Sequence, residues 1–303
     1  MVKIENAHEG VIHHAALNYY GTRLATCSSD KTVKIFEIND VNNSSSLLET
    51  LVGHEGPVWY ADWCHPSLGE NLLATCGYDG KVLIWKESGH GGKMQIIGKH
   101  AVHSASVNCV KWAPHEYGLI LLCGSADGKI SVVELKDGQI ASTKILDNAH
   151  KFGVNSISWA PLVKTDSSDD GDETTAVKQF ISGGNDNLVK IWKFDDDQET
   201  YVVADTLEGH KDAVTAVDWS PTTLLQSYVA SVSNDKQCLV WTQDHSSKKN
   251  DWKKISVNEG KFEQKLGSVS WSLSGNLLAV SDDDKNVTIW KESGDGKWEE
   301  VVN

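Results

Sequence analysis

Histidine, serine or threonine, aspartate and tryptophan recur in the same order along this chain. An aspartate that orients a histidine beside a hydroxyl group is the arrangement with which hydrolases activate a serine nucleophile. A catalytic set occurs once in a chain, whereas this one recurs in five copies. We therefore predict a structural hydrogen-bond network, worth about 1 kcal/mol net per bond, formed by His54, Asp79, Trp85, His103, Asp127, His150, Asp186, Trp192, His210, Asp235 and Trp241.

Other candidate chemistry is weaker. Cys64, His65 and Cys76 are three possible metal ligands at no recognised spacing, and Cys76 occupies the repeat position that Cys27 holds in another copy. No G-x-S-x-G, Walker or H-E-x-x-H motif occurs, and an enzyme would have only scattered carboxylates such as Asp62 and Asp218. We therefore expect no catalytic residues, no metal and no cofactor.

The spacing of these residues defines an internal repeat. Its closing position is held by Phe36, Trp85, Val133, Trp192, Trp241 and Trp290, which are 49, 48, 59, 49 and 49 residues apart. An aspartate precedes each of them by six residues, and in five copies a histidine stands nine residues before Leu17 or a tryptophan. The sixth copy has Phe262 in place of this histidine. A period near 49 indicates a repeat architecture.

Each copy contains short runs of β-branched and aromatic residues between turn signals, such as 58–63, 72–76, 81–85 and 93–97 in the second copy. Four antiparallel strands per copy are typical of a β-propeller blade, and the histidine and tryptophan-aspartate signature resembles WD40 repeats. We predict an all-β protein with one propeller domain over 1–303, repeats at about 8–48, 54–98, 103–146, 150–205, 210–257 and 262–302, and an acidic loop at 163–178.

The two ends of the chain indicate that the ring is not closed. Residues 291–302 match 86–97, so the sixth blade has its own outer strand at about 297–302. The N-terminal strand is then surplus, which predicts an open six-bladed propeller that awaits a seventh blade from a partner by β-augmentation. We expect this blade to dock on Val2, Lys3, Ile4, Glu5, Val287, Ile289 and Trp290.

Composition and charge limit the ligands and the cellular compartments that suit this chain. The chain has 28 Lys and Arg against 42 Asp and Glu, a net charge of −14, which disfavours direct binding of nucleic acid or an anionic membrane. The N-terminal ten residues lack the features of a signal peptide, and the longest apolar run, 119–123, is too short to span a bilayer. The six cysteines contain no C-x-x-C pair and suit a reducing cytosol or nucleus.

Several segments go beyond a general WD40 pattern: HEGPVWYADWCHP from His54, YDGKVLIWKE from Tyr78, HAVHSASVNCVKWAPHEYG from His100 and WSLSGNLLAVS from Trp271. They resemble the small WD40 subunit of the COPII outer coat. The resemblance implies a non-enzymatic scaffold for ER-to-Golgi vesicles, completed by a blade from a helical-rod coat subunit. It implies further roles in the nuclear pore scaffold and in a vacuole-associated nutrient-signalling complex, with cytoplasmic, ER-membrane, nuclear-pore and vacuolar locations.

The family pattern differs from this chain in the fifth and sixth copies, where Ala213 and Thr215 replace a tryptophan and an arginine and Gly267 is also altered. A second interpretation stays open, a closed WD40 propeller that reads peptides as an adaptor in a chromatin or ubiquitin-ligase complex. The surplus N-terminal strand distinguishes the two, because a closed ring uses that strand to complete its last blade.

Overall fold

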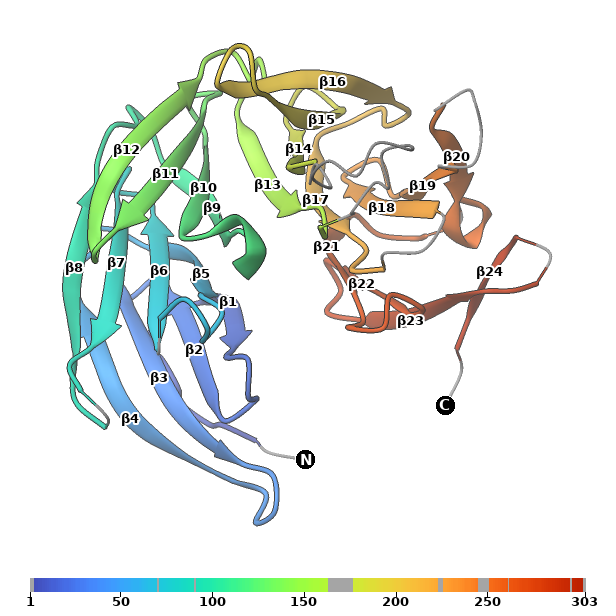
Figure 1. The fold of residues 1–303 in the computed structure, drawn as a ribbon. Helices are drawn as coiled ribbons and strands as arrows, with labels where there is room; N and C mark the ends of the chain where they lie inside the picture. Colours follow the sequence, from blue (N-terminus) through green and yellow to red (C-terminus); the bar gives the residue numbers. More distant parts are fainter. Residues whose placement is uncertain are drawn as a thin grey trace, which may run out of the picture. The chain divides into compact units, whose positions relative to one another are not determined.

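The computed structural model describes residues 3–69, 71–89, 91–162, 177–222, 226–244, 251–260, 262–294 and 296–301. The described chain forms six antiparallel sheets, each of four consecutive strands (Figure 1). These are the six predicted blades of a WD40 β-propeller, numbered here in chain order. Two short 3₁₀ helices accompany them, and the described residues contain no helix that is long and apolar enough to cross a membrane.

The chain divides into two compact units, Met1–Asp147 and Asn148–Asn303. The first unit contains blade 1 with β1 (Ile12–Leu17), β2 (Arg23–Ser28), β3 (Thr32–Asn39) and β4 (Ser44–Val52), blade 2 with β5 (Val58–Trp63), β6 (Leu72–Gly77), β7 (Val82–Glu87) and β8 (Met94–His100), and blade 3 with β9 (Val107–Trp112), β10 (Ile120–Ser125), β11 (Ile130–Lys136) and β12 (Gln139–Leu146). The 3₁₀ helix η1 (His115–Tyr117) joins β9 to β10.

The second unit contains blade 4 with β13 (Val154–Trp159), β14 (Gln179–Gly184), β15 (Leu188–Asp195) and β16 (Thr200–Glu208), blade 5 with β17 (Val214–Trp219), β18 (Gln226–Ser233), β19 (Cys238–Asp244) and β20 (Lys253–Ser256), and blade 6 with β21 (Leu266–Trp271), β22 (Leu278–Asp282), β23 (Val287–Glu292) and β24 (Trp298–Glu300). The 3₁₀ helix η2 (Val257–Gly260) follows β20. Most of the predicted acidic loop, 163–176, lies outside the described residues, and the single-domain boundaries stay a prediction.

The repeated aspartate sets the tight turn between the second and third strand of a blade. The residue that follows it has a left-handed backbone, with φ between 67° and 83° at Lys31, Gly80, Gly128, Asn187, Lys236 and Lys285. In blades 1 to 5 the aspartate carboxylate accepts the backbone N–H two residues further on. This side-chain bond stabilises a turn whose left-handed position only glycine adopts without cost.

Apolar side chains alternate between two faces of each blade, because successive residues of a strand point to opposite sides. We call the face that packs on the following blade the front face and the other the back face. In blade 2 the front face carries Val82 and Ile84, which pack with Val107 and Trp112 of blade 3. The back face carries Leu83 and Trp85, which pack with residues of blade 1. Blades 5 and 6 share a core of the same kind.

Hydrogen bonds join neighbouring blades beside these apolar cores. The indole N–H at the end of the first strand donates to a carbonyl of the preceding blade, from Trp63 to Ala16 at 3.0 Å and from Trp112 to Asp62 at 3.1 Å. Each first strand also has a β-bulge near its start. At the bulge of blade 5, Thr215 Oγ1 donates to Leu266 O of blade 6 at 2.6 Å.

Candidate partner-docking faces

The front face of blade 6 is uncovered. Val287, three residues before the closing position, is 65% exposed. The same position is no more than 1% exposed in the other five blades, at Val33, Val82, Ile130, Val189 and Cys238. Ala279 and Ile289 of the same face are partly exposed, whereas their counterparts Ala74 and Ile84 are fully buried. Blade 6 therefore presents an apolar sheet surface of the kind that every other blade buries.

The back face of blade 1 is uncovered along its first strand, although Phe36 of the same face is buried. Ile12 is 46% exposed and Leu17 is 57% exposed. At the position of Ile12 the other blades bury Val58, Val107, Val154, Val214 and Leu266 almost completely. Soluble proteins rarely expose contiguous apolar sheet faces unless a partner covers them. These two faces are the strongest candidates for a binding surface in the described part of the chain.

The two chain ends behave differently. The predicted outer strand of blade 6 is confirmed, because β24 pairs with β23 through Trp290 and Glu300, Lys291 and Glu299, and Glu292 and Trp298. The predicted N-terminal strand is not formed by residues 3–5, where the Lys3 and Glu5 side chains make an exposed ion pair at 2.6 Å. A strand without a neighbour has no ladder of hydrogen bonds to hold it extended. Val2 lies outside the described residues.

Trp290 does not belong to the exposed face. Its side chain is buried on the back face, in the core that blade 6 shares with blade 5, and its ring lies 5.5 Å from that of Phe262. Its Nε1 donates to Thr288 Oγ1 at 2.8 Å. Val287 and Ile289 lie on the opposite face because they are an odd number of residues away. Trp290 therefore faces away from this exposed surface, and its contact with a docked blade stays a prediction.

The repeated polar residues form buried networks inside single blades. In blade 4, His150 Nδ1 contacts Asp186 Oδ1 at 2.7 Å, His150 Nε2 contacts Ser182 Oγ at 2.8 Å, and Trp192 Nε1 donates to Ser182 Oγ at 2.8 Å. The aspartate favours a proton on Nδ1, which leaves Nε2 to accept from the serine. The same network joins His54, Thr75, Trp85 and Asp79 in blade 2 and His210, Ser231, Trp241 and Asp235 in blade 5.

The burial of the hydroxyl groups determines whether these networks could activate a nucleophile. The hydroxyl-bearing residues Thr75, Ser182 and Ser231 have no exposed surface. A nucleophile must reach a substrate, so hydroxyl groups at these depths serve to satisfy buried polar atoms. In blades 1 to 5 the aspartate also accepts the backbone N–H of the residue after the histidine; Glu55 N, for example, donates to Asp79 Oδ2 at 3.0 Å. The network therefore joins the loop before the first strand of a blade to the turn between its second and third strands.

Blade 3 contains a variant that the sequence reasoning missed. Val133 stands where four other copies have tryptophan, and the hydroxyl group comes from Ser131. His103 Nε2 contacts Ser131 Oγ at 2.9 Å, and His100 Nε2 contacts the same oxygen at 2.8 Å. His100, the last residue of β8, thus replaces the missing indole. The sequence indicates this variant by the absence of tryptophan at Val133, because the buried hydroxyl group then lacks the hydrogen bond that an indole N–H donates in other blades.

This pair of imidazoles predicts acid sensitivity. Burial and the charge of His103 lower the pKa of His100 from 6.5 to about 4. Between these values the unfolded chain binds a proton at this residue and the folded chain does not, so stability is complete above about pH 6.5 and falls as the pH drops toward 4. In urea unfolding at about pH 7 and about pH 5, His100→Gln should reduce the loss of stability by about 1–2 kcal/mol. An unchanged pH dependence would contradict this assignment.

The scattered carboxylates join blades. Asp62 Oδ2 accepts the backbone N–H of Trp112 at 2.8 Å, and Asp62 Oδ1 lies 3.4 Å from Lys111 Nζ. Burial raises the pKa of Asp62 above its ordinary value, against the opposing charge of Lys111. Asp218 Oδ2 accepts the backbone N–H of Trp271 at 2.9 Å. Each carboxylate therefore joins its own blade to the next one along the chain.

The structure also shows where the three possible metal ligands, Cys64, His65 and Cys76, lie. Cys64 and Cys76 belong to the apolar core between blades 2 and 3, and burial raises the pKa of Cys64 to about 12. His65 lies outside that core, with its ring stacked on that of His115 at 4.3 Å. No group of three or more metal-ligating side chains occurs within the described ranges. A cysteine thiol buried in this way behaves as a small apolar group.

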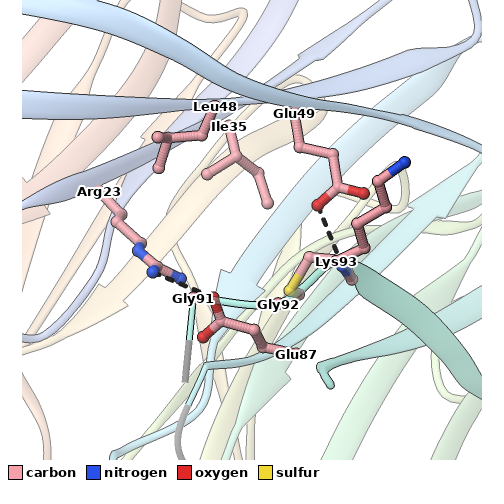
Figure 2. A pocket seen from close by; sticks show the side chains of 9 residues that line it. Arg23, Ile35, Leu48, Glu49, Glu87, Gly91, Gly92 and Lys93 are labelled. Atoms are coloured by element: carbon pink, nitrogen blue, oxygen red, sulfur yellow. Dashed lines mark hydrogen bonds and ion pairs between the residues drawn. The ribbon is translucent and has the colours of Figure 1, made fainter. Parts of the chain in front are cut away.

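A cavity of about 210 Å³ lies where blades 1 and 2 meet (Figure 2). Arg23 Nη2 pairs with Glu87 Oε1 at 3.1 Å, and Glu49 Oε2 accepts the backbone N–H of Met94 at 3.0 Å. Arg23 and Glu87 thus form an ion pair across the two blades, and Glu49 of blade 1 is bonded to the backbone of blade 2. These two contacts hold blades 1 and 2 together.

Comparison with known proteins identifies relatives over nearly the whole chain. The WD domain, G-beta repeat family matches residues 1–37, 45–86, 94–133, 142–193, 202–242 and 252–291. Proteins named protein transport protein SEC13 are 50% identical in Yarrowia lipolytica, over 99% of this chain and 98% of the relative, and 52% identical in Debaryomyces hansenii, over 93% and 92%. The Emericella nidulans protein of that name is 47% identical over 98% and 96%.

Proposed function

Since this chain belongs to the Sec13 family of WD-repeat protein transport proteins, we propose that it is a non-enzymatic scaffold subunit that a partner completes with a seventh blade. The assemblies are the COPII outer coat of ER-to-Golgi vesicles and the nuclear pore scaffold. The partner is a helical-rod subunit of either assembly, or of a vacuole-associated complex. The chain then acts on the cytoplasmic side of these membranes and reaches them only through its partners.

The observation that carries this proposal is the exposure of Val287 at a position that five other blades bury. A sheet laid on the front face of blade 6 would cover Val287, Ile289 and Ala279. It would gain the packing that Val82, Ile84 and Ala74 have in blade 2. The exposed back face of blade 1 requires a cover of the same kind. One donated blade satisfies both needs if the ring is open, as the resemblance implies.

Val2, Lys3, Ile4 and Glu5 have a second role in this proposal. They form a strand only when the donated blade offers a neighbour, which agrees with the absence of a strand at residues 3–5 in the isolated chain. Main-chain hydrogen bonds supply the affinity in β-augmentation. A blade held by both packing and strand pairing fixes the angle between the propeller and the rod. Stiffness at this joint is the mechanical contribution that we assign to the chain.

The test is affinity purification of the full chain and of a variant that lacks residues 1–6, followed by mass spectrometry. We expect the full chain to recover a coat-rod or pore-scaffold subunit and the truncated chain to retain much less of it, with unchanged thermal unfolding. A Lys3→Ala, Glu5→Ala double variant is the control, because it keeps the backbone that pairs. Recovery of histone or ubiquitin-ligase partners alone would refute the scaffold proposal, and full retention by the truncated chain would refute the role of the strand.

A further inference from the structure

A second pocket lies on blade 4 and serves none of the roles above. Its volume is about 550 Å³, within the range of ligand sites, and it is lined by Asn148, Lys151, Phe152, Asn185, Asp186, Asn187, Leu188 and Lys190. These residues lie in the loop before β13, in the turn between β14 and β15, and at the start of β15. The pocket is thus built within a single blade.

The repeat provides an internal control for what this pocket adds. After the network histidine, blade 4 has Lys151 and Phe152, whereas blades 1, 2, 3 and 5 have Glu9 and Gly10, Glu55 and Gly56, Ser104 and Ala105, and Lys211 and Asp212. At the position of Lys190 the other blades have Lys34, Leu83, Ser131, Leu239 and Thr288. Only blade 4 combines two lysines with a phenyl group here. The fold does not need this combination, since five blades form without it.

The side chains of the pocket are arranged to receive a ligand. Phe152 is 61% exposed, an unusual position for a phenyl group, and Lys151 Nζ lies 5.1 Å from the centre of its ring. The loop is held in place, because Asn185 Nδ2 donates to Phe152 O at 2.9 Å. Asn155 Nδ2 in turn donates to Asn185 Oδ1 at 2.7 Å. The exposed ring is therefore held by a fixed backbone.

The charge available in the pocket is positive. Asp186 is the single carboxylate among the lining residues, and its oxygens already accept from His150 Nδ1 at 2.7 Å, Lys151 N at 3.0 Å and Leu188 N at 3.4 Å. Lys190 Nζ donates one bond, to Ala149 O at 2.6 Å, and an ammonium group has three donors. Two lysines in one pocket, one of them beside an apolar ring, are a local exception on a chain of net charge −14.

We propose that this pocket binds an acidic peptide segment of a partner protein, whose carboxylates pair with Lys151 and Lys190 and whose apolar side chain packs on Phe152. The carboxamides of Asn148 and Asn187 both donate and accept, which suits the N–H and C=O groups of a peptide backbone. The net charge of −14 disfavours a polyanion of high charge density, such as nucleic acid. This interaction is separate from the donated blade and does not depend on it.

Isothermal titration calorimetry of the full chain at low salt tests the proposal. The probe is the peptide acetyl-Glu-Glu-Phe-Asp-Glu-amide, and its uncharged counterpart is acetyl-Gln-Gln-Phe-Asn-Gln-amide. We expect saturable binding of the acidic peptide and no binding of its uncharged counterpart. Lys151→Gln should weaken the binding about tenfold or more, because it removes a charge-assisted contact. Phe152→Ala should weaken it as well, because the apolar side chain loses its surface.

Lys211→Gln is the matched control. Lys211 occupies the same loop position in blade 5, directly after the network histidine, and its substitution changes the net charge of the chain by the same amount. Binding should be unchanged in this variant if the pocket on blade 4 is the site. Equal weakening by Lys151→Gln and Lys211→Gln would show a general charge effect and overturn the proposal. So would the absence of saturable binding to a wild-type chain whose thermal unfolding is normal.

Discussion

A Val287→Asp variant is expected to lose its partner while keeping its fold. Val287 is 65% exposed in the isolated chain, so a carboxylate there stays in water and the stability should change by less than about 0.5 kcal/mol. In the proposed complex the same carboxylate is buried without a counter-charge against a donated sheet. Burial of an unpaired charge costs several kcal/mol, which corresponds to binding about 100-fold weaker or more.

Two further variants make this experiment decisive. Val82→Asp changes the equivalent residue of blade 2, which is fully buried, and should unfold the first unit or lower its stability by more than about 4 kcal/mol. Leu273→Asp places the same charge on a residue of blade 6 that is 99% exposed, in the turn after β21, and should leave the partner bound. Thermal unfolding and quantitative mass spectrometry of the purified complexes measure both effects.

The outcome for Val287 separates the two interpretations of the sequence. A peptide-reading propeller binds its ligand with loop residues, so a change on a sheet face between strands would not alter what it recovers. Loss of a coat or scaffold subunit from Val287→Asp, with retention by Leu273→Asp, supports the donated blade. Equal retention by both variants would show that the front face of blade 6 is not a docking surface.

The repeat made most of the fold predictable from sequence. Turn chemistry and strand pattern are local properties, and Asp79 with Gly80 predicts the turn between β6 and β7 from the two residues alone. The network of His54, Thr75, Asp79 and Trp85 follows from the fixed spacing of those residues in successive copies. The outer strand of blade 6 was predictable because its residues match those of blade 2, so one known strand served as a template for the other.

Other features depend on tertiary contacts that a pattern does not contain. The N-terminal residues read as a strand by composition, but a strand needs a partner, and residues 3–5 have none in the isolated chain. Trp290 packs in the core that blade 6 shares with blade 5, a tertiary contact that the repeat pattern does not show. His100 joined the blade 3 network from the end of an outer strand, a contact 31 residues away from Ser131 in sequence.

One signal of the uncovered faces was present in the sequence. The tryptophan nine residues after the network histidine donates its indole N–H to the preceding blade, as Trp63 does to Ala16. Blade 1 has Leu17 at this position, which has no indole N–H to donate. Thr215, at the bulge of blade 5, donates a hydrogen bond to blade 6. Blade 6 has Gly267 at the same position, and glycine has no side chain that could donate such a bond. The missing groups lie on the two faces that the structure leaves exposed.

Asp218→Ala is the stability change with the largest expected effect on the second unit. The Asp218 carboxylate accepts from Ser158 Oγ of blade 4 at 2.9 Å and from the backbone N–H of Trp271 of blade 6 at 2.9 Å. Alanine removes both acceptors and leaves two inward-facing donors without them. The expected loss is about 3 kcal/mol, because each bond to a charged acceptor is worth about 1.5–3 kcal/mol. The thermal midpoint should fall by about 6–12 °C.

Asp196→Ala is the charge-matched control, since it also removes one negative charge, on an exposed hairpin between β15 and β16. Its midpoint should stay within about 1–2 °C of the wild type, because isolated surface changes contribute little. Ser158→Ala should also lower the midpoint, since it removes the donor to Asp218 and the acceptor of the Trp219 backbone N–H at 3.1 Å, while the contact of Asp218 with Trp271 remains. Calorimetry that gave the same midpoint for Asp218→Ala and Asp196→Ala would show that this carboxylate does not hold blades 4, 5 and 6 together.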